Sequence, residues 1–189
     1  GDPDQMEQIL AEGKVDLIGM VRSLIADPEL PNKIKYGRAD DITPCQRCNA
    51  CISESFVPYV KYPSRVLRCT ANPTFFREIM TDNLKPAAEH KRVLVAGGGP
   101  AGMQAAITLA DRGHQVILCE KTDSLGGALK FARHVSFKQN LDKLMNVLIR
   151  RVHSRAIEVM LNTEATPELA KHLNVDCVIA AIGGEPIIP

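Results

Sequence analysis

The chain lacks an excess of charge of either sign, and it lacks any long hydrophobic run. Its 189 residues include 23 basic and 22 acidic side chains, which leaves a net charge of +1. This balance gives no electrostatic reason to expect nucleic acid or an anionic membrane as a partner. No apolar run approaches the roughly 20 residues of a membrane-spanning helix, and the N-terminus has no signal-peptide pattern. We therefore expect a cytoplasmic protein with neither nucleic acid nor membrane as partner.

The six cysteines are unevenly distributed, and their distribution predicts two different roles. Disulfides are rare in the reducing cytosol, so cysteines in such a chain are more often metal-binding or catalytic. Cys119 and Cys177 each stand alone inside a short apolar run, which predicts small buried core residues. The other four fall in one loop-like stretch: Cys45, Cys48, Cys51 and Cys69.

The stretch that carries these four cysteines, residues 41 to 88, has little hydrophobic periodicity. Prolines punctuate it at positions 44, 58, 63, 73 and 86. A stretch of this kind cannot build a core from apolar side chains alone. If it is ordered, a metal centre is the natural cause, because metal binding and folding are coupled in small irregular segments.

The spacing of the four thiols favours an iron–sulfur cluster. Cys45-x-x-Cys48-x-x-Cys51 supplies three thiolates from one tight loop, and Cys69 supplies a remote fourth. A cubane 4Fe–4S cluster takes four thiolates, commonly in this way. Structural zinc also takes four cysteines, but usually as two separated Cys-x-x-Cys pairs, and the sequence has no second pair. We predict a 4Fe–4S cluster, with zinc as the alternative.

The sequence predicts secondary structure on both sides of this stretch. Residues 1 to 40 indicate a helix, a buried strand at 15–20 and a helical turn at 22–26. From about residue 89 the pattern becomes α/β, because short apolar runs alternate with helical ones. The expected strands are 92–96, 115–120, 157–161 and 175–181, and the expected helices are 100–112, 137–153 and 167–172.

A glycine-rich turn in this second part predicts a dinucleotide site. Gly97, Gly99 and Gly102 match the Gly-x-Gly-x-x-Gly pattern between a predicted strand and a predicted helix. Gly97 permits the tight turn, Gly99 lets the backbone approach a pyrophosphate at the helix N-terminus, and Gly102 allows close helix–strand packing. Glu120 ends the next strand and is expected to accept hydrogen bonds from ribose hydroxyls. The turn alone suits FAD or NAD.

The three segments together resemble the iron–sulfur flavoenzymes related to old yellow enzyme, which include 2,4-dienoyl-CoA reductase, trimethylamine dehydrogenase and NADH:flavin oxidoreductases. Residues 13–28 (GKVDLIGMVRSLIADP) resemble the eighth strand and following turn of the family's TIM barrel. Residues 45–51 (CQRCNAC) and 69–73 (CTANP) resemble its cluster-binding motifs. Residues 125–127 (LGG) and 176–183 (DCVIAAIG) resemble flavin-contacting parts of disulfide-reductase-like domains, which favours FAD over NAD.

The resemblance implies an α/β chain in three parts. Residues 1–40 would end an FMN-binding TIM barrel, 41–88 would form the irregular 4Fe–4S segment, and 89–189 would begin a partial FAD-type Rossmann-like domain. The chain is then an internal fragment of a longer protein. Most of the FMN barrel would precede residue 1, and an NAD(P)H-binding domain would follow the segment at 186–189. No catalytic residue is therefore expected here, and the fragment alone is expected to be inactive.

The resemblance also implies cofactor roles for individual residues. Arg22 corresponds to an arginine that binds the FMN phosphate, and the four cysteines correspond to the cluster ligands. FAD would be bound by the following residues: Gly97, Gly98, Gly99, Pro100, Ala101, Gly102, Glu120, Lys121, Gly127, Ala181 and Gly183.

For the complete protein, the resemblance implies an NAD(P)H-dependent oxidoreductase. Electrons would pass from NAD(P)H to FAD, through the cluster to FMN, and then to an activated C=C bond of an enoate or enoyl-CoA type small molecule. Amine dehydrogenases of the same family pass electrons outward instead. A stand-alone electron-transfer or cofactor-binding module and a zinc-stabilised interaction domain are further alternatives, and an oligomer is compatible with all of them.

The predicted strand at 15–20 leads to a separate expectation. Without its barrel neighbours, this segment would expose unpaired backbone groups and an apolar face. We expect it to be disordered, to pair with the Rossmann-like part, or to pair with another chain.

Overall fold

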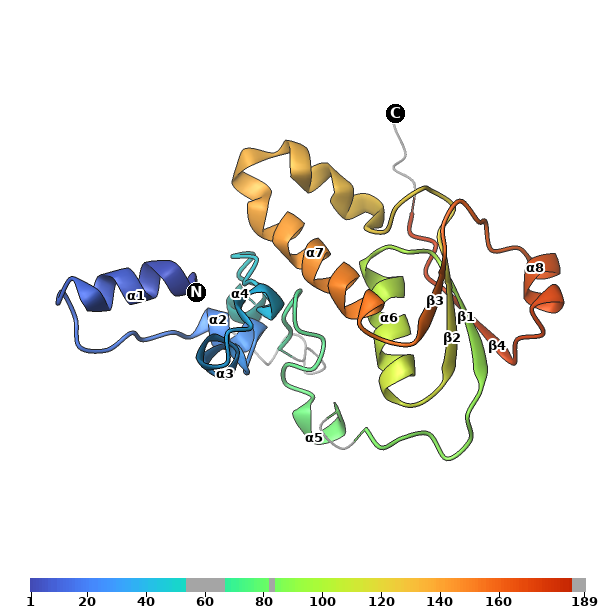
Figure 1. The fold of residues 1–189 in the computed structure, drawn as a ribbon, viewed down its shortest axis with the longest axis horizontal. Helices are drawn as coiled ribbons and strands as arrows, with labels where there is room; N and C mark the ends of the chain where they lie inside the picture. Colours follow the sequence, from blue (N-terminus) through green and yellow to red (C-terminus); the bar gives the residue numbers. More distant parts are fainter. Residues whose placement is uncertain (54–66, 82–83, 185–189) are drawn as a thin grey trace. The chain divides into compact units, whose positions relative to one another are not determined.

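The computed structural model describes residues 1–53, 67–81 and 84–184. The chain forms two compact units, residues 1–83 and residues 84–189, whose elements are drawn in Figure 1. Residues 186–189, where a crossing into a further nucleotide domain is predicted, lie outside the described residues. No helix in the described part of the chain is long and apolar enough to cross a membrane.

The second unit is built on a four-stranded parallel sheet. Its strands are β1 (Arg92–Ala96), β2 (Gln115–Cys119), β3 (Ile157–Met160) and β4 (Cys177–Ala180), in the order β3-β2-β1-β4. The chain steps outward from β1 to β3 and then returns to the other side of β1. The predicted α/β class with a parallel sheet is confirmed, because each predicted strand forms within two residues of its expected bounds.

Helices cover both faces of this sheet. Helices α6 (Pro100–Asp111) and α7 (Gln139–His153) lie on one face, and α8 (Pro167–His172) lies on the other (Figure 1). Two 3-10 segments, η2 (Gly127–His134) and η3 (Ser136–Lys138), lead into α7. Proline occupies the first turn of α6 and of α8, where its missing N–H removes no helical hydrogen bond.

The core of the second unit lies on both faces of the sheet. On the α8 face, Leu94, Ile117 and Cys119 pack against apolar residues that include Leu169. Cys119 is buried as predicted. The prediction for Cys177 is wrong, because its side chain is exposed. The reason is its position: β4 is an edge strand of the described sheet, so the side chains of that strand lack a neighbour on one side.

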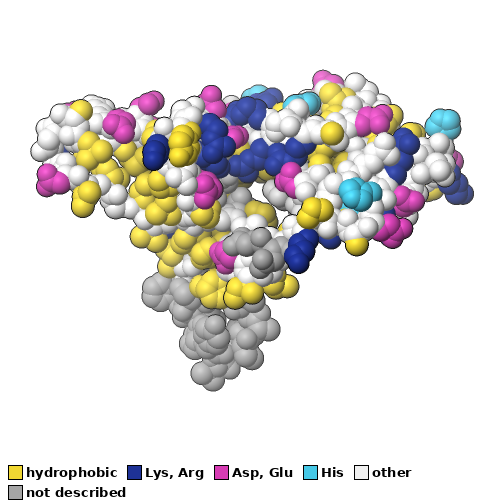
Figure 2. Space-filling model, turned by 60° about the horizontal axis from the view of Figure 1, so that its bottom comes forward, with side chains coloured by type: hydrophobic (Ala, Val, Ile, Leu, Met, Phe, Trp, Pro, Cys, Tyr) yellow, Lys and Arg dark blue, Asp and Glu magenta, His cyan; other side chains and the backbone are white. Residues whose placement is uncertain are grey.

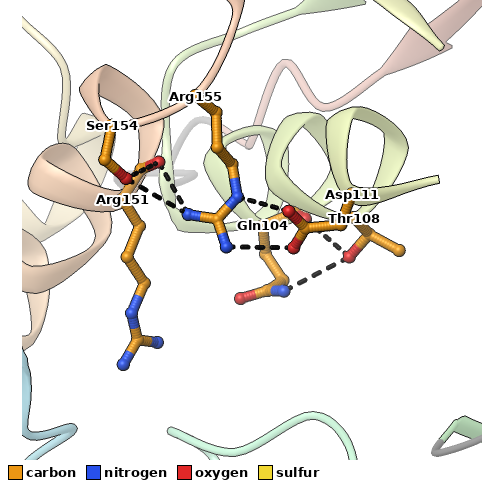
Figure 3. Close-up of polar contacts among 6 residues, drawn as sticks. All are labelled: Gln104, Thr108, Asp111, Arg151, Ser154 and Arg155. Atoms are coloured by element: carbon orange, nitrogen blue, oxygen red, sulfur yellow. Dashed lines mark hydrogen bonds and ion pairs between the residues drawn. The ribbon is translucent and has the colours of Figure 1, made fainter. Parts of the chain in front are cut away.

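A bidentate ion pair joins the end of α6 to the segment that follows α7. Arg155 Nε and Nη2 donate to Asp111 Oδ1 and Oδ2 at 2.6 and 3.0 Å, and Arg155 Nη1 donates to the carbonyl oxygen of Arg151 at 2.9 Å (Figure 3). The pair is half-exposed, so it contributes orientation more than stability. Arg155 lies two residues before β3 begins at Ile157.

The first unit consists of short helices joined by irregular segments. Its helices are α1 (Pro3–Ala11), α2 (Arg22–Ala26), α3 (Leu30–Lys35), the 3-10 turn η1 (Ala39–Asp41), α4 (Ala50–Ser53) and α5 (Glu78–Thr81). Asp2 begins α1, and its side chain accepts a hydrogen bond from the backbone N–H of Gln5. The helices predicted at the N-terminus and at 22–26 are therefore present.

The strand predicted at residues 15–20 does not form. The segment belongs to no sheet of the described residues, and the side chains of Val15 and Leu17 are 41% and 86% exposed. A parallel strand requires a hydrogen-bonded neighbour, and the described strands all pair within the second unit. The three expected outcomes for this segment (disorder, pairing with the Rossmann-like part, or pairing with another chain) stay predictions. Figure 2 shows hydrophobic side chains, in yellow, on one face of the molecule.

Candidate cofactor sites

The glycine-rich turn follows β1 and leads directly into α6. Gly97 has a φ of 107°, a backbone conformation that favours glycine. Its N–H donates to the carbonyl oxygen of Cys119 at 2.8 Å, and the N–H of Ala181 donates to that of Ala96 at 2.8 Å. The turn is therefore held between the ends of β2 and β4, at the carboxyl edge of the sheet where ligands bind in this architecture.

Close backbone contacts explain why two positions of this turn, Gly97 and Gly102, and one position beside it, Gly127, are glycine. A Cβ atom on Gly97 would collide with the carbonyl oxygen of Ala181, and one on Gly102 would collide with that of Gly97. On the other side, a Cβ atom on Gly127 would lie 2.8 Å from the Cα atom of Gly99. The structure thus brings Gly97–Gly99, Gly102, Gly127 and Ala181 together around the N-terminus of α6.

Glu120 lies beneath the turn and is only 7% exposed. Its Oε2 accepts a hydrogen bond from the N–H of Gly98 at 2.8 Å, and its Oε1 accepts from the N–H and the hydroxyl of Thr122 at 2.9 Å each. The predicted ribose acceptor therefore also ties the glycine turn to the end of β2. Each carboxylate oxygen offers two lone pairs, so acceptor capacity is left for a ribose hydroxyl.

The same hydrogen bonds determine the charge of Glu120. Burial raises the pKa of this carboxyl group, but the backbone N–H groups of Thr122 and Gly98, the Thr122 hydroxyl and the positive charge of Lys130 outweigh burial, and the pKa is lowered overall. Lys130 Nζ donates to Thr122 Oγ1 at 2.8 Å. Neither Thr122 nor Lys130 belongs to the sequence motif.

We expect the stability of the second unit to decrease in acid through Glu120. An unfolded glutamate titrates near pH 4.3, and the folded pKa is lower. The stabilisation is therefore fully present above about pH 4.3 and is lost as the pH falls through the folded pKa. Glu120→Gln should lower the free energy of unfolding at pH 7 by about 1.5–3 kcal/mol and should flatten the acid dependence.

Urea unfolding between pH 3 and pH 7 measures both effects. Glu164→Gln is the matched control, because Glu164 is an exposed glutamate of the same unit. An equal loss of stability in the two variants would contradict the role assigned to Glu120.

The remaining predicted FAD residues lie around this turn. Pro100 and Ala101 form the first turn of α6. Lys121 is exposed, and Gly183 has a φ of 77° with open space on its Cα. The packed turn does not include Lys121 or Gly183. FAD binding by these two residues and by the residues of the turn stays a prediction.

In the first unit, a buried ion pair anchors the start of the cysteine segment. Asp27 and Lys33 are 4% and 9% exposed, and Lys33 Nζ donates to Asp27 Oδ2 at 2.6 Å. The same oxygen accepts the N–H of Thr43 at 2.7 Å, and Lys33 Nζ also donates to the carbonyl oxygen of Asp41 at 3.0 Å. The chain is thereby fixed two residues before Cys45.

Two further hydrogen bonds anchor the segment to α2. Arg22 Nη1 donates to Asn49 Oδ1 at 2.6 Å, and Asn49 stands between Cys48 and Cys51. Asn72, three residues after Cys69 and 8% exposed, donates from Nδ2 to the carbonyl oxygen of Ile25 at 2.8 Å. Polar contacts with one short helix thus hold both cysteine-bearing stretches. The sequence composition suggested a metal centre as the cause of order here, but these hydrogen bonds also order the segment.

Left-handed backbone turns separate the first three cysteines. Arg47 and Asn49 have φ values of 54° and 59°, a region that non-glycine residues seldom adopt and asparagine tolerates best. The bond from Arg22 stabilises Asn49 in this conformation.

The four thiols are neighbours, but they are not gathered around a single point. All six cysteines of the chain are thiols. Burial raises the pKa of Cys51, and negative charge on Cys69, Cys45 and Cys48 adds to the rise. Over the described residues, which include all four, no group of three or more His, Cys, Asp or Glu side chains is placed to hold one metal ion.

Cys48 differs from Cys51 in its surroundings. Its Sγ lies 3.2 Å from Thr70 Oγ1. Burial raises the pKa of the Cys48 thiol, but hydrogen bonds from the Thr70 hydroxyl and from backbone N–H groups that include Ala50 outweigh burial and lower the pKa. The Cys48 sulfur thus lies in a setting that favours the thiolate, the form that binds metal.

The sequence indicated the cysteines, the glycine turn and Glu120, but it did not indicate the polar residues that support them. Asp27 directly follows the helical turn predicted at 22–26, and its sequence position indicates no anchoring role. The hydrogen bonds of Asp27, Asn49, Thr70 and Asn72 join residues that are 16 to 47 positions apart in the sequence. The polar residues in and beside the cysteine motifs were the only sequence signal that could have predicted these supporting hydrogen bonds.

Two family models match different parts of the chain. A model described as the NADH:flavin oxidoreductase / NADH oxidase family matches residues 1–41. A model described as FAD dependent oxidoreductase matches residues 92–178.

Individual proteins match along nearly the whole chain. An NADH oxidase of Thermoanaerobacter brockii is 42% identical over 189 residues, which cover 100% of this chain and 28% of the oxidase. A cinnamate reductase of Clostridium sporogenes is 35% identical over 188 residues, which cover 98% of this chain and 27% of the reductase. The solved structure of histamine dehydrogenase from Rhizobium sp. 4-9 matches with a TM-score of 0.83 at 32% identity, over 96% of this chain and 26% of that one. The chain thus spans little more than a quarter of the length of the relatives that it matches.

Proposed function

The chain belongs to the NADH:flavin oxidoreductase family of flavoenzymes related to old yellow enzyme, and from this we propose that the complete protein is an NAD(P)H-dependent reductase. In this proposal electrons pass from NAD(P)H to FAD, through a 4Fe–4S cluster to FMN, and on to an activated C=C bond. The substrate is a small molecule of the enoate or enoyl-CoA type, and the reaction takes place in the cytoplasm.

One observation carries the proposal: the four cysteines lie between two flavin-related matches. The match to the NADH:flavin oxidoreductase family ends at residue 41, and the FAD-related match begins at residue 92. The segment from Cys45 to Cys69 lies within this interval. An electron carrier between two flavins has to lie between the domains that bind them. We accordingly assign 1–40 to the end of an FMN-binding barrel, 41–88 to the cluster segment and 89–189 to the first part of the FAD domain.

The donor set fits an iron–sulfur cluster. Four thiolates within electrostatic range of one another repel, and the charge that Cys69, Cys45 and Cys48 exert on Cys51 is such a repulsion. A positively charged core between them removes it. Structural zinc usually takes its four cysteines as two separated Cys-x-x-Cys pairs, and this chain has no second pair. Four thiolates are the usual ligand set of a 4Fe–4S cluster, which when bound would supply one-electron transfer.

The residues of this chain would position the two flavins. The glycine turn and the N-terminus of α6 would bind the FAD pyrophosphate, because backbone N–H groups and the helix dipole favour anions there. Arg22 would bind the FMN phosphate. Its bond to Asn49 would then keep the phosphate-binding arginine and the cysteine loop in a fixed relation.

Cofactor analysis of the complete protein, purified without oxygen, tests the proposal. We expect iron and labile sulfide at about four each per chain, together with FAD and FMN. Cys48→Ser should lose iron, whereas Cys177→Ser, which changes an exposed cysteine outside the segment, should keep it. Stoichiometric zinc in place of iron would contradict the cluster, and a single flavin would contradict the electron path.

A second candidate function is amine dehydrogenation with outward electron flow. The match to histamine dehydrogenase, with a TM-score of 0.83, favours it. Anaerobic flavin absorbance separates the two. Bleaching by NADH or NADPH followed by reoxidation with cinnamate supports the reductase, whereas bleaching by an amine alone supports the dehydrogenase.

A further inference from the structure

A threonine hydroxyl lies against one of the four cysteine sulfurs. Thr70 Oγ1 is 3.2 Å from Cys48 Sγ, which is hydrogen-bonding distance for a sulfur acceptor. The two residues are 22 positions apart, and Thr70 directly follows Cys69. A residue beside one thiol of the set therefore contacts the sulfur of another.

The direction of this hydrogen bond follows from the state of Cys48. In the thiol form, either atom can be the donor. A metal-bound cysteine is a thiolate and has no proton to give, so in the loaded protein the hydroxyl donates and the sulfur accepts.

We propose that the hydroxyl of Thr70 raises the reduction potential of the cluster held by the four cysteines, by donating a hydrogen bond to the sulfur of Cys48. This inference rests on the proposed function, because it requires the cluster. Thr70 is a positioning and tuning residue, and it does not touch the substrate.

The physical basis is the distribution of the added electron. Reduction adds one negative charge, supplied by reduced flavin, and part of that charge is carried by the ligating sulfurs. A donor dipole directed at one of them stabilises the reduced state more than the oxidised state, and hydrogen bonds to sulfur are a known determinant of cluster potentials. No bond forms or breaks, and the proton remains on Thr70 Oγ1.

The exposure of the contact limits its size. Thr70 and Cys48 both lie at the surface of the first unit, where water screens dipoles more than it does in a core. We therefore expect a modest effect: loss of the hydroxyl should reduce the equilibrium constant for cluster reduction about three- to tenfold, where tenfold corresponds to 59 mV for a one-electron couple.

Two variants at this position isolate the hydroxyl. Thr70→Val keeps the shape of the side chain and removes the donor, whereas Thr70→Ser keeps the donor. An anaerobic titration of the complete protein, followed by electron paramagnetic resonance, measures the midpoint potential. This potential should fall in the valine variant. In the serine variant, the equilibrium constant for cluster reduction should stay within twofold of its original value. Thr81→Val is the matched control, because its hydroxyl donates to the carbonyl oxygen of Arg77.

Each outcome decides the inference. An unchanged potential in Thr70→Val, with iron and sulfide retained, overturns it and leaves the proposed function standing. Absence of iron and sulfide from the unaltered protein overturns the proposed function itself. If valine disturbs the loop, Thr70→Ala must show the lower potential. Loss of iron from both the valine and alanine variants, with retention in the serine variant, would assign Thr70 to holding the cluster and would overturn the tuning role.

Discussion

Asp27→Ala will release the cysteine segment from the helices that support it. The substitution leaves the ammonium group of Lys33 buried without its carboxylate, and it removes the acceptor for the N–H of Thr43. Breaking a buried ion pair from one side destabilises by about 3–5 kcal/mol. We expect the backbone amides just before Cys45 to exchange with solvent deuterium more than about 100-fold faster, since each 1.4 kcal/mol is tenfold.

Hydrogen exchange on the complete protein, read by mass spectrometry on peptides from this region, measures the change. Glu12→Gln is the matched control, because it breaks the exposed ion pair of Glu12 with Lys14 in the same unit, and exposed pairs contribute little. The double variant Asp27→Leu with Lys33→Met removes both charges and should recover part of the stability. Equal exchange in Asp27→Ala and the control would refute the anchoring role.

Gly102→Ala will weaken the binding of FAD. The new methyl group would overlap the carbonyl oxygen of Gly97. The methyl carbon is bonded directly to the backbone of α6 and the oxygen belongs to the backbone of the turn, so neither can rotate away. Overpacking of this kind destabilises by about 1–3 kcal/mol, which corresponds to about 10- to 100-fold weaker binding if the bound state bears it. The glycine turn and α6 would move apart, and the proposed pyrophosphate site between them would be distorted.

The flavin content of the purified complete protein and its dissociation constant for FAD report this effect. Gly19→Ala serves as the control, because a Cβ atom there would meet nothing within 4 Å and its φ is not positive. A Gly102→Ala protein that binds FAD as tightly as the control would show that the turn does not form the cofactor site.

The second unit was predictable from the sequence because its signals are local. Strand β1 and helix α6 each carry their own pattern within a dozen residues, and Gly97, Gly99 and Gly102 mark the turn between them. Glu120 was predicted as a ribose acceptor, but its bonds to Gly98 and Thr122 were not, since no periodicity reveals which way a carboxylate turns.

The first unit was predictable only in part because its contacts are polar and distant. The segment at 15–20 has the composition of a buried strand, yet a strand exists only if a neighbour pairs with it, and composition cannot supply that neighbour. Asp27 and Asn72 form their bonds across 16 and 47 positions. Cys177 illustrates the same limit, because an apolar run predicts a strand but not whether the strand lies at an edge.

The anchoring of the cysteine loop by α2 also has a consequence for metal uptake. Ordering a residue costs about 1–2 kcal/mol of conformational entropy. In small metal-dependent folds this loss occurs when the metal binds, and it weakens metal binding. Here the bonds to Thr43, Asn49 and Asn72 restrict the loop during folding of the polypeptide itself. Less ordering is then left to accompany metal binding, which would raise the affinity of the proposed cluster site for its metal.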